Sequence, residues 1–292
     1  MKYTGPIYRP PYEANSLLLQ VTVGCAHNKC TYCTMYRDVK FAIESIEQIE
    51  KDLQEAKQLY GDVKRVFLVN GDAFVLSAGR LKPIAELIIK YFPDVEVITM
   101  YASINNIKGK SDEELRELRD LRINDLWVGL ETGNEEALDY MNKGFTLKDS
   151  YEQLERLNKA GMRHIGIFIF GGAGRGKGIQ NAIDTAKLIN AAKPMAIATT
   201  TMGAFGDSQL AKDVESGKFV PATELEVLEE QKKLLELIEV ENMAYLGIHA
   251  INTVSFDALL PRDRDKAIKV IDDAIEKLDD EFLNSVPERH SI

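Results

Sequence analysis

The chain has 292 residues, of which 45% are hydrophobic and 28% are charged, as in ordinary soluble globular proteins. This length allows one large barrel-type domain or two smaller domains. The 36 basic and 46 acidic residues give a net charge of −10, which argues against a broad nucleic-acid-binding surface. There is no apolar run of about 18 residues that could span a membrane. Because "MKYTGPIYRPPYEA" lacks the apolar core of a secretory signal, we expect a cytoplasmic protein.

A strand-like run followed by an amphipathic helix recurs along the chain. In chain order, the first predicted elements are strand 16–24, helix 43–60, strand 65–74, helix 81–91, strand 95–103, helix 111–121 and strand 125–133. They are followed by helices 135–141 and 147–160, a strand with a glycine-rich loop at 163–178, helix 179–192 and strand 195–202. The last predicted elements are a helix opened by Thr223 and Glu226, a strand at 243–250 and a helix at 264–279.

This alternation predicts an α/β fold in which a parallel sheet is covered by helices. Six such units indicate a partial (β/α)6 TIM-like barrel with a short C-terminal strand–helix extension. We expect the barrel core at 1–205 and the extension, which packs on the barrel and closes it, at 206–292. In barrels of this kind the chemistry gathers in the loops that follow the strands. The alternating charges of "TELEVLEEQKKLLELIEVE" predict that this tail helix presents a solvated outer face.

All three cysteines lie in one short stretch, "TVGCAHNKCTYCTMY", which follows the first predicted strand. Thiolates in C-x4-C-x2-C spacing converge readily on one metal centre. A [4Fe–4S] cluster held by Cys25, Cys30 and Cys33 would keep one iron open to another ligand. Zinc with His27 as a fourth ligand, or with three ligands and a water, is the alternative that the loop alone leaves open.

The position of this loop and several further motifs resemble the radical S-adenosylmethionine (SAM) superfamily. The resemblance covers nearly the whole chain and points to the branch with the oxygen-independent coproporphyrinogen oxidases and the elongator catalytic subunit. The motifs that carry it are "CTYCTMYRDVKF", "VFLVNGDAF", "LWVGLETGNEEAL", "MNKG" and "HAINTVSFDALLPRD". The chain departs from the usual C-x3-C-x2-C spacing by one inserted residue, which affects the geometry of the loop rather than the identity of the ligands.

The resemblance implies one [4Fe–4S] cluster on the three cysteines and SAM on its open iron. Reductive cleavage of SAM would give a 5′-deoxyadenosyl radical that abstracts hydrogen from a small organic substrate. By the same resemblance, ten further residues and one basic residue would contact SAM or substrate. Those expected at SAM are Tyr32, Asn70, Gly71, Asp72, Ser103, Glu131, Gly171 and Gly172, and a basic residue for its carboxylate would be Lys143, Arg37 or Arg175. His249 would contact substrate, with Asn252 in the same segment.

Each of these residues also has a structural interpretation. "NGD" after a strand is equally typical of a turn, and a carboxylate such as Glu131 can form an ion pair at a barrel rim. The loop "GGAGRG" matches phosphate-binding glycine patterns only in part, so we prefer glycines that let the backbone approach adenine. His164 is expected to be structural because it begins a strand, and His290 lies in a polar tail.

The expected partners are a small-molecule substrate and an electron donor, reduced ferredoxin or flavodoxin. No membrane partner is expected, and the acidic composition argues against nucleic acid. Two alternatives stay open: a zinc-binding, non-redox protein that uses the same cysteines, and a tRNA-directed radical SAM enzyme. The enzyme would be oxygen-sensitive. Its substrate and oligomeric state are not fixed by the sequence.

Overall fold

The computed structural model describes residues 1–289, so His290 lies outside the described residues. The chain divides into two compact units. The first comprises Met1–Asn28, Met35–Gly129 and Glu152–His164, and the second comprises Lys29–Thr34, Leu130–Tyr151 and the chain from Ile165 onward. Within residues 1–289, no helix combines the length and the apolar character of a membrane-spanning segment.

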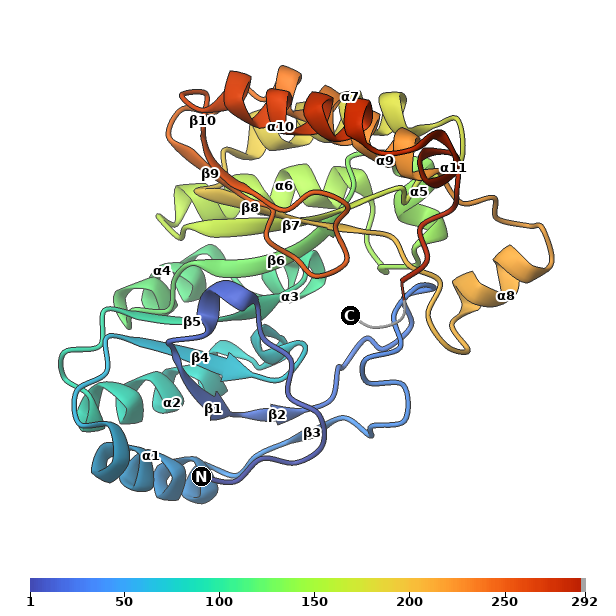
Figure 1. The fold of residues 1–292 in the computed structure, drawn as a ribbon. Coiled ribbons are helices and arrows are strands. Elements are labelled where there is room, and N and C mark those ends of the chain that lie inside the picture. The colour runs from blue at the N-terminus through green and yellow to red at the C-terminus, as the bar shows by residue number, and fades with distance from the viewer. Residues whose placement is uncertain (290–292) are drawn as a thin grey trace. The chain divides into compact units, whose positions relative to one another are not determined.

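In the first unit, parallel strands pair in the order β1, β4, β5 and β6. The strands are β1 (Leu17–Gln20), β4 (Arg65–Val69), β5 (Val97–Ala102) and β6 (Leu126–Glu131), whose last two residues belong to the second unit. The helices between them are α1 (Ile46–Tyr60), α2 (Ala78–Tyr91), α3 (Ile104–Lys108) and α4 (Asp112–Asp120). Helices α1, α2 and α4 follow one another beside these strands (Figure 1), and their apolar faces bury Leu53, Leu81 and Leu115.

In the second unit, β7, β8 and β9 pair in parallel and β10 joins β9 antiparallel. These strands are β7 (His164–Phe170), β8 (Ala196–Thr201), β9 (Met243–Leu246) and β10 (Asp257–Leu260). The helices are α5 (Glu135–Tyr140), α7 (Gly178–Ala192), α8 (Gln209–Glu215), α9 (Glu224–Leu237), α10 (Arg264–Lys277) and α11 (Asp280–Leu283). Helix α6 (Leu147–Lys159) begins in this unit and belongs to the first unit from Glu152 onward. Helix α9 packs against both α7 and α10 (Figure 1). The predicted alternation of strands and helices is present. The structure adds four short elements that the sequence patterns do not predict, α3, α8, β10 and α11.

Helix boundaries follow the capping residues. Ser111 and Thr223 each open a helix in a reciprocal capping box with Glu114 and Glu226, as predicted. The prediction that Ile43 belongs to the first helix is wrong, because Ala42–Ile43 forms β3 and pairs with β2 (Thr22–Val23). Ser45 caps α1 by accepting a hydrogen bond from Gln48 N, so the residues before it stay extended.

The solvated outer face predicted for α9 is also corrected. Glu224, Glu230 and Gln231 are at most 3% exposed, beside buried leucines and valine on the same helix. The prediction fails because α9 lies between α7 and α10. The neighbouring helices therefore cover polar as well as apolar side chains of α9. The carboxylates of this helix therefore require partners inside the second unit.

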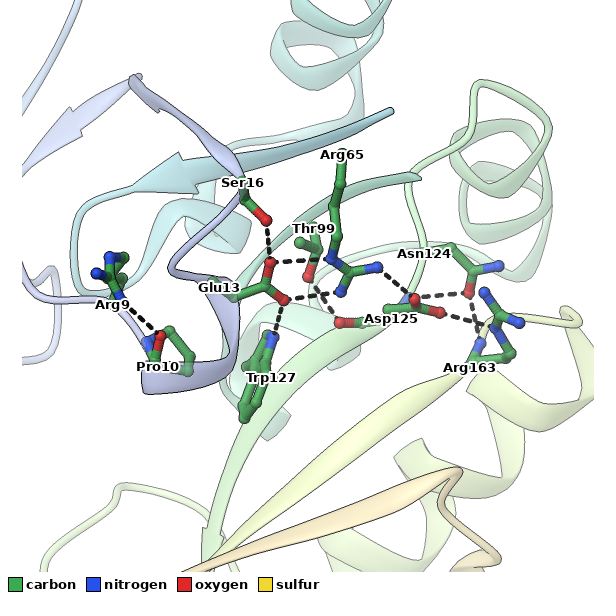
Figure 2. A network of polar contacts seen from close by, with 10 residues as sticks. All are labelled: Arg9, Pro10, Glu13, Ser16, Arg65, Thr99, Asn124, Asp125, Trp127 and Arg163. Atoms are coloured by element: carbon green, nitrogen blue, oxygen red, sulfur yellow. Dashed lines mark hydrogen bonds and ion pairs between the residues drawn. The ribbon is translucent and has the colours of Figure 1, made fainter. Parts of the chain in front are cut away.

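A buried ion network ties the beginnings of β4 and β6 together in the first unit (Figure 2). Arg65 donates to Glu13 and to Asp125, in both cases at 2.7 Å. Glu13 also accepts from Trp127 Nε1 at 2.8 Å, and Arg163 Nε donates to Asp125 at 2.7 Å. These side chains lie where the strands start, so they stabilise the end of the unit away from the loops that follow the strands.

Candidate cofactor site

The cysteine loop carries turns and bends but no helix or strand from Gly24 to Phe41. None of the three cysteines is in a disulfide, and all three are partly exposed. Cys33 N donates to Cys30 O at 3.3 Å, which closes the C-x2-C segment into a turn. Three thiols that are not in disulfides, in a segment free of regular structure, suit the thiolate coordination that iron–sulfur clusters use.

The second half of the loop is anchored inside the second unit by backbone groups. Thr31 N donates to Met141 O at 3.2 Å, just after α5, and Thr31 O accepts from Leu210 N in α8 at 2.9 Å. The side-chain amide of Asn142 donates to Lys29 O at 2.9 Å. The C-x2-C turn is therefore held by the end of α5 and by α8, a helix that no local pattern predicts.

Next to this turn lies a buried ion pair between Glu131 and Lys143. Lys143 Nζ donates to Glu131 Oε1 at 2.5 Å, and the two side chains are 12% and 6% exposed. Burial opposes the charge on Lys143, but Glu131, together with Tyr32 and Cys30, outweighs it and raises the pKa of Lys143 well above its usual value. The structure thus brings together three predicted residues, because Tyr32 interacts electrostatically with both members of the pair.

Tyr32 stays a neutral phenol at this position. Burial raises its pKa well above the usual value, and the carboxylate of Glu131 adds to the rise while Lys143 opposes it. The backbone of Glu131, the last residue of β6, is left-handed with φ of +66°. A non-glycine residue rarely takes this conformation, and such residues are concentrated at functional sites.

The glycine-rich loop after β7 belongs to the same unit. Gly171 has φ of +76°, which favours glycine, and its N–H donates to Glu230 Oε2 at 2.9 Å. A Cβ at Gly172 would lie 2.2 Å from the terminal methyl of Met141, so glycine allows a close approach of this side chain. Arg175, exposed in this loop, donates to Pro221 O, whereas Lys143 forms the ion pair with Glu131.

In the first unit, the "NGD" segment follows β4. Asn70 N donates to the hydroxyl of Thr22 at 3.1 Å, and its side-chain amide donates to Thr22 O at 3.3 Å. A Cβ at Gly71 would lie 2.3 Å from the ring of Tyr36, so this glycine is required by a side chain of the protein itself. Asp72 is 5% exposed, and it lies in the field of the buried Lys110.

Lys110 was not identified from the sequence. Its Nζ donates to Phe74 O at 2.7 Å and lies 4.1 Å from the centre of the Phe74 ring. Burial lowers the pKa of Lys110 to about 8, while Asp72 opposes that change. No local pattern marks this lysine, since its burial depends on the packing of α3 against the turn after β4.

Two further predicted residues, Ser103 and Arg37, lie in the first unit. Ser103 is the N-cap of α3, with a hydroxyl that accepts from Asn106 N and a backbone N–H that the Asn106 side chain caps in return. Arg37 is partly exposed in the loop that follows the cysteines. Ser103 therefore fixes the start of a helix at the end of β5.

His249 and Asn252 lie beside the end of β8 in the second unit. Asn252 donates to Thr199 O and Gly247 O, both at 2.9 Å, and its carbonyl oxygen accepts from Thr201 at 3.2 Å. His249 Nδ1 lies 3.4 Å from the hydroxyl of Thr200, and partial burial lowers the pKa of His249. Asn252 thus anchors the segment, and His249 is a neutral imidazole at the end of a strand.

Among residues 1–289, no three histidine, cysteine, aspartate or glutamate side chains form a group that could hold a metal ion as they stand. The assignment of a cluster therefore rests on the donor set of the loop and on the relatives of the chain.

The sequence model of the radical SAM superfamily matches residues 19–189, which is more than half of the chain. The chain belongs to the radical SAM superfamily. Its fold is of the α/β class, and a [4Fe–4S] cluster and SAM are the cofactors of this superfamily.

The relatives place the chain in the predicted branch. It is 28% identical over 145 residues to the heme chaperone HemW of Lactococcus lactis subsp. lactis (strain IL1403), a match that covers 49% of this chain and 38% of that protein. The match therefore spans well under half of the length of this relative.

Solved structures of the branch share the fold. Coproporphyrinogen III oxidase (HemN) from Escherichia coli, a radical SAM enzyme, has a TM-score of 0.51 at 16% identity, covering 64% of this chain and 44% of that one. The archaeal Methanocaldococcus infernus Elp3 has a TM-score of 0.56 at 11% identity, covering 90% and 63%. At these identities the likeness concerns the fold, and the reaction of this chain has to be argued from its own residues.

Proposed function

We propose that Cys25, Cys30 and Cys33 hold one [4Fe–4S] cluster and that the enzyme acts on a small organic substrate. When bound, the cluster and SAM supply a 5′-deoxyadenosyl radical that removes a hydrogen atom from substrate. The observation that carries the proposal is the C-x2-C turn with the buried Glu131–Lys143 pair in its electrostatic field. Thiolates, a carboxylate and an ammonium group in one place suit a cluster and a zwitterionic amino-acid moiety.

The Glu131–Lys143 pair provides both charges that such a moiety needs. SAM carries an amino group and a carboxylate, so Glu131 can accept from its amino or ribose groups while Lys143 faces its carboxylate. On binding, Glu131 would exchange the ammonium group of Lys143 for the amino group of SAM, and Lys143 would exchange Glu131 for the SAM carboxylate. Neither buried charge would then lack an opposite charge. The neutral phenol of Tyr32 would lie against adenine, together with the backbone at Gly171 and Gly172.

Four residues of the first unit are proposed as SAM contacts on the family resemblance. Asn70, Gly71 and Asp72 would receive the SAM amino group, and Ser103 would contact it from the start of α3. The hydrogen bonds of Asn70 to Thr22 support this role, because they fix the turn in one conformation. A rigid turn loses little conformational entropy when a ligand binds.

His249 would face substrate from the segment that Asn252 anchors. We further propose reduced ferredoxin or flavodoxin as electron donor, a cytoplasmic location and sensitivity to oxygen. The division into a barrel core at 1–205 and a closing extension at 206–292 is likewise our proposal.

The experiment is anaerobic reconstitution followed by incubation with dithionite and SAM. We expect about four irons and four sulfides per chain, and release of 5′-deoxyadenosine detected by mass spectrometry. Deuterated candidate substrates would then report hydrogen transfer. About one zinc with no sulfide would overturn the proposal in favour of a zinc protein.

A second candidate function is suggested by the relative named as a heme chaperone. In this role the protein would bind heme. Titration of the reconstituted protein with heme would show a shifted Soret band if this role applies, and formation of 5′-deoxyadenosine without heme binding would exclude it.

A further inference from the structure

Three buried polar side chains of the second unit connect the ends of β6 and β7. The hydroxyl of Thr132, which follows Glu131, donates to Asn181 Oδ1 at 2.5 Å. Asn181 Nδ2 donates to Glu230 Oε1 at 2.5 Å, and the other oxygen of Glu230 accepts from Gly171 N at 2.9 Å. The chain of hydrogen bonds therefore runs from the residue after Glu131 to the first glycine of the loop after β7.

The position is an expensive one for a carboxylate. Glu230 is 1% exposed, and burial raises its pKa to about 7 although the hydrogen bonds from Gly171 and Asn181 oppose the rise. The charged groups that face it are Glu226 on its own helix and Glu131, which lines the same cavity of about 10 Å³. No basic residue is among the described residues that line this cavity. Packing alone would favour an apolar residue here.

Helix α9 uses a second carboxylate on the same loop. Glu226, one turn before Glu230, accepts from Gly176 N at 2.7 Å. Two acidic residues four positions apart repel each other on a helix surface. Their common feature is that each binds a backbone N–H of the glycine-rich loop, whose glycines at 171 and 176 both have positive φ. A loop of such freedom needs fixed partners to keep one conformation.

We propose that Glu230 and Asn181 are positioning residues that hold the ends of β6 and β7, and with them Glu131 and Gly171, in the arrangement that binds SAM. This inference rests on the proposed function, which places those two residues at SAM. Neither Glu230 nor Asn181 would touch the ligand. They would act by fixing the backbone next to it, as outer residues commonly do for those that bind.

The test uses an exchange of the two partners. In Glu230→Gln, the new amide can accept from Gly171 N, but its NH2 group meets the NH2 group of Asn181, and turning the Asn181 amide over to avoid this takes away the acceptor of the Thr132 hydroxyl. In Glu230→Gln combined with Asn181→Asp, that NH2 group donates to the new carboxylate, which can still accept from Thr132. The double variant therefore restores the complete set of donors and acceptors. Glu229→Gln, on the exposed face of the same helix, is the matched control.

SAM affinity of the reconstituted protein is measured by calorimetry for all four proteins. We expect Glu230→Gln to bind SAM about tenfold to a hundredfold more weakly, the exchanged pair to recover most of that loss, and the control to equal wild type. Equal affinity of Glu230→Gln and wild type, or an exchanged pair no better than Glu230→Gln, would overturn the inference. If Glu230→Gln does not fold, the exchanged pair is compared directly with wild type. SAM affinity close to wild type then supports the inference, and a loss of more than tenfold contradicts it.

A second readout needs no cofactor. The amide resonance of Gly171 in the cluster-free protein should shift with pH around a midpoint near 7, as Glu230 ionises, and should lose this shift in Glu230→Gln. A Gly171 resonance that is the same in wild type and Glu230→Gln would refute the hold of Glu230 on the loop. If wild type itself does not bind SAM while Gly171 titrates as expected, the proposed function is wrong. The chain of hydrogen bonds from Thr132 to Gly171 then has a structural role only.

Discussion

Removal of one partner of the Glu131–Lys143 pair should destabilise the protein strongly, whereas removal of both should not. At 2.5 Å the attraction is about 6–7 kcal/mol with an effective dielectric constant of about 20. Desolvation of each ion, at several kcal/mol, offsets most of this gain. Lys143→Met leaves Glu131 as an uncompensated carboxylate that is 6% exposed, and we expect a loss of about 3–5 kcal/mol in the free energy of unfolding.

The assay is urea unfolding at pH 7 without SAM, for wild type, Lys143→Met, Glu131→Leu and the double variant. We expect the double variant to be close to wild type, since apolar residues of similar volume often replace a buried ion pair without loss. The coupling energy between the two sites should then amount to several kcal/mol. Losses below about 1 kcal/mol that add in the double variant would refute the reasoning, because they are typical of a solvent-exposed pair.

Three further predictions concern the loop, a buried histidine and the ion network. Cys25→Ala, Cys30→Ala and Cys33→Ala should each abolish iron incorporation and formation of 5′-deoxyadenosine while the circular dichroism spectrum is kept; full SAM cleavage by any of them would contradict the cluster assignment. Burial lowers the pKa of His164 to about 4, so the unfolded chain binds a proton that the folded one excludes between about pH 4 and 6.5. Wild type should therefore lose about 3 kcal/mol on acidification through this window and His164→Phe should lose less, as followed by chemical unfolding; parallel pH profiles would disprove this. Glu13→Ala should cost about 1–3 kcal/mol in the same assay, because Trp127 Nε1 loses its acceptor and Arg65 keeps only Asp125 as a carboxylate partner, and a loss below about 0.5 kcal/mol would rule that out.

Local patterns in the sequence determined the chemistry that the chain can carry and most of its elements. The three cysteines fall in one loop whatever the rest of the fold does, because nine residues of chain hold them together. Helix starts at Ser111 and Thr223 follow from capping groups within four residues of each other. Such contacts depend on the backbone nearby, so periodicity and capping are sufficient to predict them.

Tertiary structure alone decided which charged residues are buried together. By sequence, Glu230 is one of many charges on a helix predicted to be solvated, but α7 and α10 enclose that helix in the structure. Lys143 is one of three basic candidates by sequence, and only the structure shows its ion pair with Glu131. Asn181 and Gly171 are 49 and 59 positions from Glu230 along the chain, so their contacts depend on the register of strands and the rotation of helices. A shift of one residue in the strand register, or a corresponding rotation of a helix, would move a side chain to another face. Local sequence patterns do not determine the register or the rotation.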